Sequence, residues 1–137
     1  MARFYTALAE GGMEATPEIR TMAPVRQRIF DLTPDAQAAI RASLMGVVEA
    51  GGTAASAQIK GVMLAGKTGT AQTGVFKNGV ELNHAWFAGF APADNPEIVV
   101  AVMIQFGGHG PRAARIASSI IGHYLKTTPT MLLETGG

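Results

Sequence analysis

The segment Lys67-Thr68-Gly69-Thr70 combines a cation, two hydroxyls and a glycine. If it forms a strand, side chains alternate between the two faces, so Lys67 and Gly69 share one face while Thr68 and Thr70 share the other. The two hydroxyls then stand about 7 Å apart along the strand. Such a pair can hold a carboxylate through two O–H donors, with the positive charge of Lys67 beside them. The segment is therefore a candidate carboxylate-binding site.

Gly69 adds a second feature, because a strand residue without a side chain lets a ligand backbone lie against it. If the strand lies at the edge of a sheet, its free N–H groups can bind an extended peptide or stabilise an oxyanion. A Lys-Thr-Gly triplet also occurs in ordinary polar strands. The residues on either side are therefore needed to distinguish a ligand-binding strand from an ordinary polar strand.

The residues before this segment predict two helices. Apolar residues of Met1–Leu8 recur at helical spacing, and Gly11-Gly12 ends that helix. No capping residue precedes it, which suggests that the chain starts inside a helix. A second helix is expected from Pro34 to about Glu49, with Thr33 as its N-cap. Between the two helices we expect a loop with an edge strand near 25–30.

Three successive strands and a last helix are expected from the motif onwards. The strands are predicted at 62–73, 83–91 and 97–106, and the helix at 112–126. In the second strand, His84, Trp86, Ala88 and Phe90 share a face that we expect to be mainly core, and Phe87 faces the opposite side. Short links favour antiparallel pairing, which gives an α+β fold with an antiparallel sheet of at least three strands flanked by helices. We expect one domain portion over 1–126 and a tail over 127–137.

The composition of the 137 residues excludes several classes of function. The formal net charge is +1 without a basic block, so nucleic-acid binding is not expected. The absence of cysteine excludes thiol catalysis and Cys-ligated metals. The three histidines are too far apart in sequence to suggest a metal site, and neither a metal nor a cofactor is expected. The apolar run Ile98–Ile104 is too short to span a bilayer.

The motif and its flanks together resemble the penicillin-binding proteins, whose relatives include the serine β-lactamases. Lys67–Gln72 reads Lys-Thr-Gly-Thr-Ala-Gln, the third signature of that family. His84–Pro92 resembles the next strand of the family, and Gly46–Ala54 the link that precedes the motif. The resemblance extends over about residues 2–126 and is nearest to the elongation-type, class B transpeptidases, specifically to the C-terminal part of their transpeptidase domain.

This resemblance implies roles for individual residues. The hydroxyls of Thr68 and Thr70 would hold the carboxylate of a D-Ala-D-Ala stem peptide or of a β-lactam, and the Thr70 N–H would belong to the oxyanion hole. Lys67 would support proton transfer. From their places on the strand itself, we expect Gly69 to line the substrate and Gln72 to touch it at the strand end. The resemblance further implies peptidoglycan stem peptides as ligands, the cell-wall elongation machinery as a partner, and the periplasmic face of the bacterial inner membrane as the location.

The chain departs from the family in lacking a nucleophile. None of the four serines begins a Ser-x-x-Lys motif, and no Ser-x-Asn motif is present. Ser56 and Lys60 miss the required spacing by one residue and lie at an expected loop. Without an activated serine no acyl-enzyme forms, so we expect the chain alone to be inactive. The nucleophile is expected in a missing N-terminal half of the domain, which would be a partner of this chain.

Two other interpretations remain open at this level. Gly61–Thr68 fits the Gly-x-x-x-x-Gly-Lys-Thr pattern of phosphate-binding loops. However, Gly69 and Thr70 make a poor helix start, whereas such a loop should open a helix. The chain could also be a peptidoglycan-binding module without chemistry, and the missing nucleophile favours this second alternative.

Overall fold

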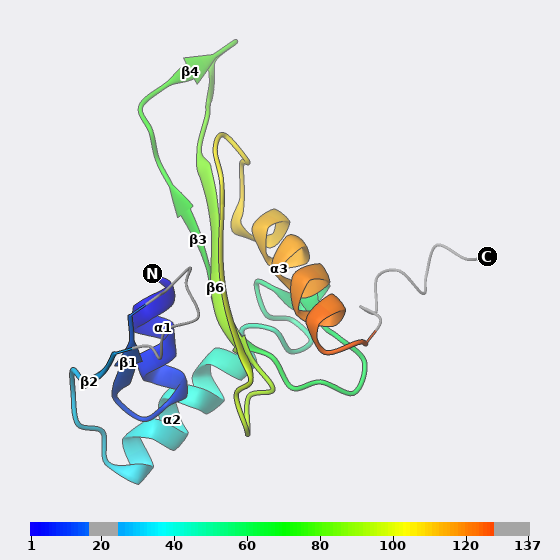
Figure 1. Ribbon diagram of the computed structural model, residues 1–137. Helices are drawn as coiled ribbons and strands as arrows, with labels where there is room; N and C mark the ends of the chain where they lie inside the picture. The colour runs from blue at the N-terminus through cyan, green and yellow to red at the C-terminus, as the bar shows by residue number, and fades with distance from the viewer. Residues whose placement is uncertain (17–24, 128–137) are drawn as a thin grey trace.

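The computed structural model describes residues 1–16 and 25–127 (Figure 1). The predicted tail therefore lies almost wholly outside the described residues. Within them the chain forms three α-helices and seven strands in an α+β arrangement, as expected. In this described part, no helix is long and apolar enough to cross a membrane.

Helix α1 (Ala2–Ala9) and a short hairpin form the first unit. As predicted, α1 ends before Gly11 and Gly12, which both have positive φ. Strand β2 (Arg26–Arg28) lies within the expected edge strand and pairs antiparallel with β1 (Met13–Ala15), where a loop was expected. The expected loop at residues 13–15 is a strand because these residues form backbone hydrogen bonds with β2, and their own sequence shows no strand pattern.

Helix α2 (Pro34–Gly46) begins as predicted, with the hydroxyl of Thr33 accepting from the Ala36 N–H at 3.2 Å. It ends three residues before the expected Glu49. The chain folds back tightly there, since a Cβ on Gly52 would lie 2.2 Å from the Val47 oxygen. A short 3-10 turn, η1 (Ala55–Ala57), then leads toward the sheet.

The central sheet has three antiparallel strands in the order β3-β6-β7. They are β3 (Ala65–Ala71), β6 (His84–Ala91) and β7 (Ile98–Ile104). All three predicted strands are therefore present, but each is shorter than expected. The first starts at Ala65 rather than Val62, because the register sets Leu64 opposite Ala91, the last residue of β6, and beyond it the Ala93 N–H donates to the Met63 oxygen at 2.7 Å without continuing the ladder.

A second hairpin was missed by the sequence analysis. Strands β4 (Phe76–Lys77) and β5 (Val80–Glu81) form a two-stranded extension that projects from the end of β3 and β6 (Figure 1). Its turn residues Asn78 and Gly79 both have positive φ, at 53° and 76°. Asn-Gly is the strongest short-range hairpin signal, so the sequence contained the information.

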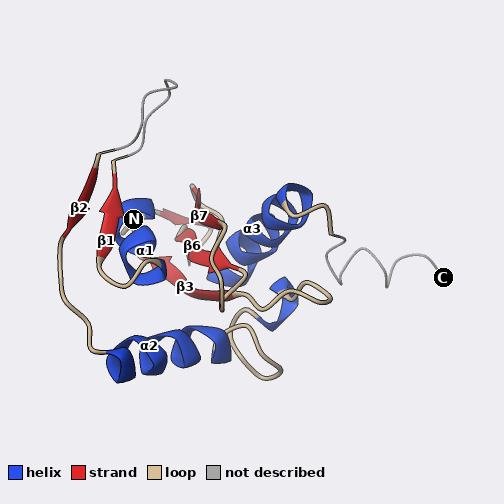
Figure 2. Ribbon diagram, turned by 60° about the horizontal axis from the view of Figure 1, so that its bottom comes forward, coloured by secondary structure: helices blue, strands red, loops and turns tan. Residues whose placement is uncertain are grey.

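The sheet lies between two layers of helices (Figure 2). Helix α3 (Gly110–Tyr124) covers one face, where Phe87 is fully buried with the alanines and Ile121 of α3. Helices α1 and α2 cover the other face around Phe90, which is 1% exposed and packs with Tyr5. The expected opposite orientations of Phe87 and Phe90 are therefore confirmed.

Candidate functional site

The Lys-Thr-Gly-Thr segment lies within β3, the outermost strand on its side of the described sheet. Lys67 is opposite Ala88 of β6, and Thr70 is opposite Ala85. Only one edge of β3 is used by β6. The other edge can therefore accept an extended peptide, as expected for an edge strand.

The two faces of β3 carry different groups, in line with the alternation derived from the sequence. Thr68 faces the start of α3, because a Cβ on Gly110 would lie 2.6 Å from the Thr68 Cβ. Lys67 contributes to a hollow of about 90 Å³ whose walls include Tyr5 and Trp86. Burial raises the pKa of the Tyr5 phenol above its ordinary 10.0, so this wall stays uncharged into the alkaline range.

Thr53 is a residue of this site that the sequence analysis did not identify. Its hydroxyl lies 2.8 Å from that of Thr68, and either hydroxyl can donate. When Thr68 donates to a bound carboxylate, Thr53 can donate to Thr68 and fix the direction of that hydroxyl. The only signal in the sequence was the tight Gly51-Gly52 turn directly before Thr53.

Lys67 gives the segment an unbalanced positive charge. Its Nζ donates to the Thr68 carbonyl oxygen at 2.8 Å. Within residues 1–16 and 25–127 the ion pairs involve only arginines, so no carboxylate neutralises Lys67 there. An exposed ammonium on the same short strand as the two hydroxyls favours an anionic ligand at this strand.

Helix α3 adds a second positive field to the same place. Its first residue, Gly110, is buried over Thr68 and Gly69, since its Cβ position lies 3.0 Å from the Gly69 nitrogen. Only glycine fits there without moving β3. The N-terminal end of a helix carries partial positive charge and attracts anions. The site is therefore electropositive from both the lysine and the helix.

Gln72 lies at the far end of this strand, beside the hairpin. Its amide donates to one oxygen of Glu81 at 3.3 Å, and the Gly74 N–H donates to the other at 2.9 Å. Glu81 thus fixes the base of the hairpin against the end of β3. The proposed contact of Gln72 with substrate remains a prediction.

The histidines are separate from the motif and from each other. His84 is half-buried and its Nδ1 accepts from the Phe106 N–H at 3.1 Å, which ties β6 to the loop before α3. His109 and His123 are exposed. In the part of the chain that the structure describes, no three His, Asp or Glu side chains gather as metal ligands would.

The serines do not form a nucleophile within the described chain. Ser43 and Ser119 each donate to a carbonyl oxygen four residues earlier in their helices, at 2.8 and 3.1 Å. Ser118 is buried, and Ser56 lies in η1. None of these contacts provides the base that activates a serine.

The phosphate-loop interpretation of Gly61–Thr68 is wrong. Lys67 and Thr68 stand in the middle of β3, whereas a phosphate-binding loop places them at the start of a helix. The positive φ of Gly61 belongs to a tight turn between Ile59 and Val62, which form an isolated bridge. The backbone N–H groups therefore do not surround an anion as that loop requires.

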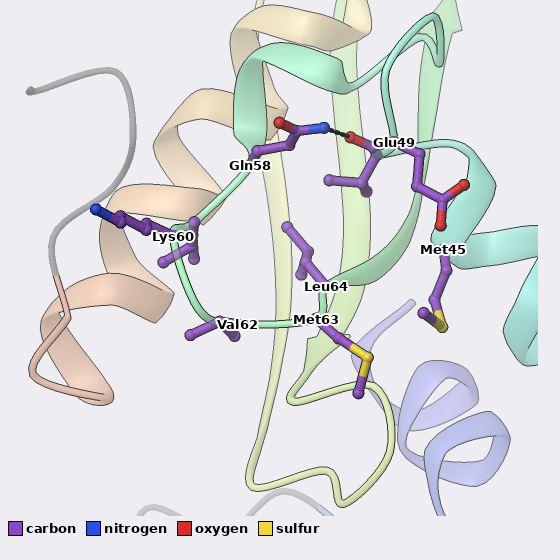
Figure 3. A pocket seen from close by; sticks show the side chains of 9 residues that line it. Met45, Glu49, Gln58, Lys60, Val62, Met63 and Leu64 are labelled. Atoms are coloured by element: carbon purple, nitrogen blue, oxygen red, sulfur yellow. Dashed lines mark hydrogen bonds between the residues drawn. The ribbon is translucent and has the colours of Figure 1, made fainter. Parts of the chain in front are cut away.

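A cavity lies at the opposite end of β3, where the chain enters the strand (Figure 3). It has a volume of about 410 Å³, and its lining ends at Leu64, directly before β3. None of the Lys-Thr-Gly-Thr residues lines it. It is therefore a feature distinct from the candidate carboxylate site.

Comparison with known proteins places the chain in a family. Residues 1–122 match the family described as penicillin binding protein transpeptidase domain. The peptidoglycan D,D-transpeptidase MrdA of Acinetobacter baumannii is 34% identical over an alignment of 115 residues that covers 77% of this chain and 17% of that protein. The probable peptidoglycan D,D-transpeptidase PenA of Neisseria meningitidis is 37% identical over 108 residues, again 77% of this chain and 18% of that protein.

Solved structures agree with these sequence relationships. The D,D-transpeptidase domain of a peptidoglycan glycosyltransferase from Eggerthella lenta superposes with a TM-score of 0.75 at 30% identity, covering 91% of this chain and 31% of that one. For PBPA from Mycobacterium tuberculosis the TM-score is 0.72 at 28% identity, covering 90% and 31%. The chain therefore spans less than a third of each of these four proteins. It belongs to the penicillin-binding protein transpeptidase family, as a class B member.

Proposed function

We propose that this chain provides the carboxylate-binding strand of a peptidoglycan D,D-transpeptidase. Thr68 and Thr70 donate to the carboxylate of a D-Ala-D-Ala stem peptide or of a β-lactam, and the Thr70 N–H belongs to the oxyanion hole. Lys67 supplies positive charge and supports proton transfer. The observation that carries the proposal is the Thr53–Thr68 hydroxyl pair beneath the first turn of α3, on a strand with one free edge.

The geometry also supports a direction for the bound peptide. A carboxylate at Thr68 and Thr70 leaves two ways for the peptide to run along β3. The Thr53 hydroxyl already occupies one side of the Thr68 hydroxyl, and we propose that this side is the one toward Ala65. The peptide therefore extends toward Ala71 and Gln72, which makes it antiparallel to β3 and places its preceding residues near the hairpin.

Catalysis requires an activated serine, and none of the four serines in this sequence begins a Ser-x-x-Lys motif. We propose that the nucleophile comes from an N-terminal half of the domain, which is then the partner of this chain. By itself the chain binds without chemistry, and the hydrogen bonds of its serines to helix carbonyls support this. For the complete protein we propose a place on the periplasmic face of the bacterial inner membrane, within the cell-wall elongation machinery.

Intact-mass spectrometry after incubation with a penicillin tests the missing nucleophile. We expect no covalent adduct on the 137-residue chain. A stoichiometric adduct on one serine would show that the chain is an enzyme in its own right.

Amide chemical shifts during titration with a peptide that ends in D-Ala-D-Ala test the binding strand. We expect saturable shifts over Lys67–Gln72, and an affinity that is weaker by at least about tenfold in Thr68→Val. Thr6→Val is a matched control, because the Thr6 hydroxyl only donates to the Ala2 oxygen within α1, at 3.1 Å. Unchanged binding by Thr68→Val would refute the assignment.

A further inference from the structure

The loop between β7 and α3 sets the position of the first turn of α3 over the carboxylate site. It spans only residues 105–109 and lies beside the start of β6 (Figure 1). Gly110 follows it directly and is buried, and a Cβ added there would lie 2.6 Å from the Thr68 Cβ and 3.0 Å from the Gly69 nitrogen. A displacement of the loop therefore also displaces the N-terminus of α3 relative to Thr68.

Three hydrogen bonds fix this loop. The Gly107 N–H donates to the Ile104 oxygen at 3.1 Å, and the Gly108 N–H donates to the Asn83 oxygen at 3.0 Å. Both acceptors are backbone carbonyls, which do not titrate. In the third bond the Phe106 N–H donates to Nδ1 of His84 at 3.1 Å. Of the three acceptors, His84 is the one whose ability to accept depends on pH.

The conformation of Phe106 makes this third bond important. Its φ is 52°, in the left-handed region that residues with a side chain rarely adopt. The Phe106 ring also packs on the His84 imidazole, with ring centroids 5.3 Å apart and planes tilted by 46°. His84 therefore contacts both the backbone and the side chain of the residue at which the loop turns.

The bond to Phe106 requires a neutral His84. Because Nδ1 accepts, it carries no hydrogen, and the ring hydrogen is on Nε2. A protonated imidazole has an N–H on both nitrogens, so its Nδ1 can no longer accept from the Phe106 N–H. Histidine is the side chain that ordinarily changes its charge between about pH 5 and 8. Protonation of His84 therefore removes one of the three bonds that fix the loop.

No ion pair offsets this loss in the arrangement that the structure describes. The charged and titratable groups on the surrounding elements are Lys77 and Glu81 of the hairpin, Lys67 of β3, His109 of the loop, Arg112 of α3, Arg3 of α1 and Glu14 of β1. Within residues 1–16 and 25–127 none of them pairs with His84. Glu81, the carboxylate of the hairpin, is engaged by the Gln72 amide and the Gly74 N–H.

We propose that His84 is a positioning residue for the carboxylate site. Neutral His84 holds Phe106, and the short loop then keeps Gly110 and the N-terminus of α3 over Thr68. Protonated His84 releases Phe106, so the α3 N-terminus is held less firmly and the site binds a carboxylate more weakly. The effect on the ligand rests on the function proposed for Thr68 and Thr70, whereas the coupling of His84 to Gly110 does not.

A titration of the ¹⁵N-labelled chain from about pH 8 to about pH 5 tests the coupling without ligand. We expect the Phe106, Gly110 and Gly69 amides to shift together with the His84 ring signals. His84→Asn should abolish these shifts and keep the amides near their high-pH positions, because the Asn oxygen accepts in place of Nδ1 and does not titrate. His84→Phe keeps a ring beside Phe106 but has no acceptor, so it should hold the amides near their low-pH positions.

The affinity for a peptide that ends in D-Ala-D-Ala tests the consequence for the site. The original chain should bind roughly two- to fivefold more weakly at the low pH than at the high pH, as for the loss of one neutral hydrogen bond. His84→Asn should keep the high-pH affinity throughout, and His84→Phe the low-pH affinity. His123→Asn removes an exposed histidine near the end of α3 and should leave the pH profile unchanged.

Several results would overturn the proposal. These are static Gly110 and Gly69 amides in the original chain, a pH dependence that His109→Asn abolishes and His84→Asn retains, and an equal affinity at both pH values. Tighter binding at low pH, or equal behaviour of His84→Asn and His84→Phe, would mean that His84 acts only through its charge. A peptide that binds at no pH would refute the function proposed for Thr68 and Thr70, and the amide shifts would still decide whether His84 positions Gly110.

Discussion

Replacing Thr53 by valine removes one hydroxyl and keeps the shape of the side chain. Thr53 is exposed and Thr68 is half-buried, so in the free protein water can replace the lost 2.8 Å contact. A neutral hydrogen bond contributes about 0.5–1.5 kcal/mol net. Because water compensates here, the loss of unfolding free energy should lie near the lower limit, at about 0.5 kcal/mol.

The effect on ligand binding should be larger than the effect on stability. In the complex, Thr68 donates to a carboxylate and depends on Thr53 to keep its hydrogen in that direction. We expect Thr53→Val to weaken binding of a D-Ala-D-Ala peptide by about 0.5–1 kcal/mol, or roughly two- to fivefold. Thr68→Val removes a bond to a charged group and should cost about 1.5–3 kcal/mol, or roughly ten- to a hundredfold.

A double-mutant cycle on the peptide titration isolates the pair. If Thr53 acts through Thr68, Thr53→Val should have no further effect once Thr68 is valine. Thr53→Ser keeps the hydroxyl and should bind nearly as well as the original chain. The reasoning is refuted if Thr53→Val weakens binding equally in both backgrounds, or if Thr53→Ser binds as poorly as Thr53→Val.

Three further predictions concern the elements around the site. Gly110→Ala places a methyl group 2.6 Å from the Thr68 Cβ and should destabilise the fold by about 1–3 kcal/mol, measured by urea unfolding; an unchanged midpoint would contradict the close approach of α3 to β3. Phe87→Ala empties the fully buried centre beneath α3 and should cost about 3–5 kcal/mol in the same assay, whereas a cost below 1 kcal/mol would mean that this core is loosely packed. Burial raises the pKa of Tyr5 above its ordinary 10.0, so the stability that Tyr5 contributes should be intact below about pH 10 and be lost as pH rises through the folded-state pKa. In Tyr5→Phe the free energy of unfolding should fall less between neutral and alkaline pH, and an identical pH profile for both proteins would refute this role.

The helices and strands were predictable wherever the sequence repeats at a regular interval. The cap at Thr33, the end of α1 at Gly11-Gly12 and the three sheet strands follow from local rules. The ends of the strands could not be predicted from local rules, because a strand extends only as far as it pairs with its partner strand. Strand β1 was missed for a similar reason, since three residues carry no periodicity of their own.

For the candidate site, the sequence by itself determined the Lys-Thr-Gly-Thr chemistry, its alternation on a strand, and the lack of a Ser-x-x-Lys nucleophile, because these depend on residue identity and local spacing. The tertiary structure alone decided that Thr53 meets the Thr68 hydroxyl from 15 positions away, that Gly110 lies over the same strand, and that a cavity forms between α2 and the entry to β3. Such contacts join segments that are distant along the chain. Only the packing of helices on both faces of the sheet brings these segments together, and no local pattern encodes that packing.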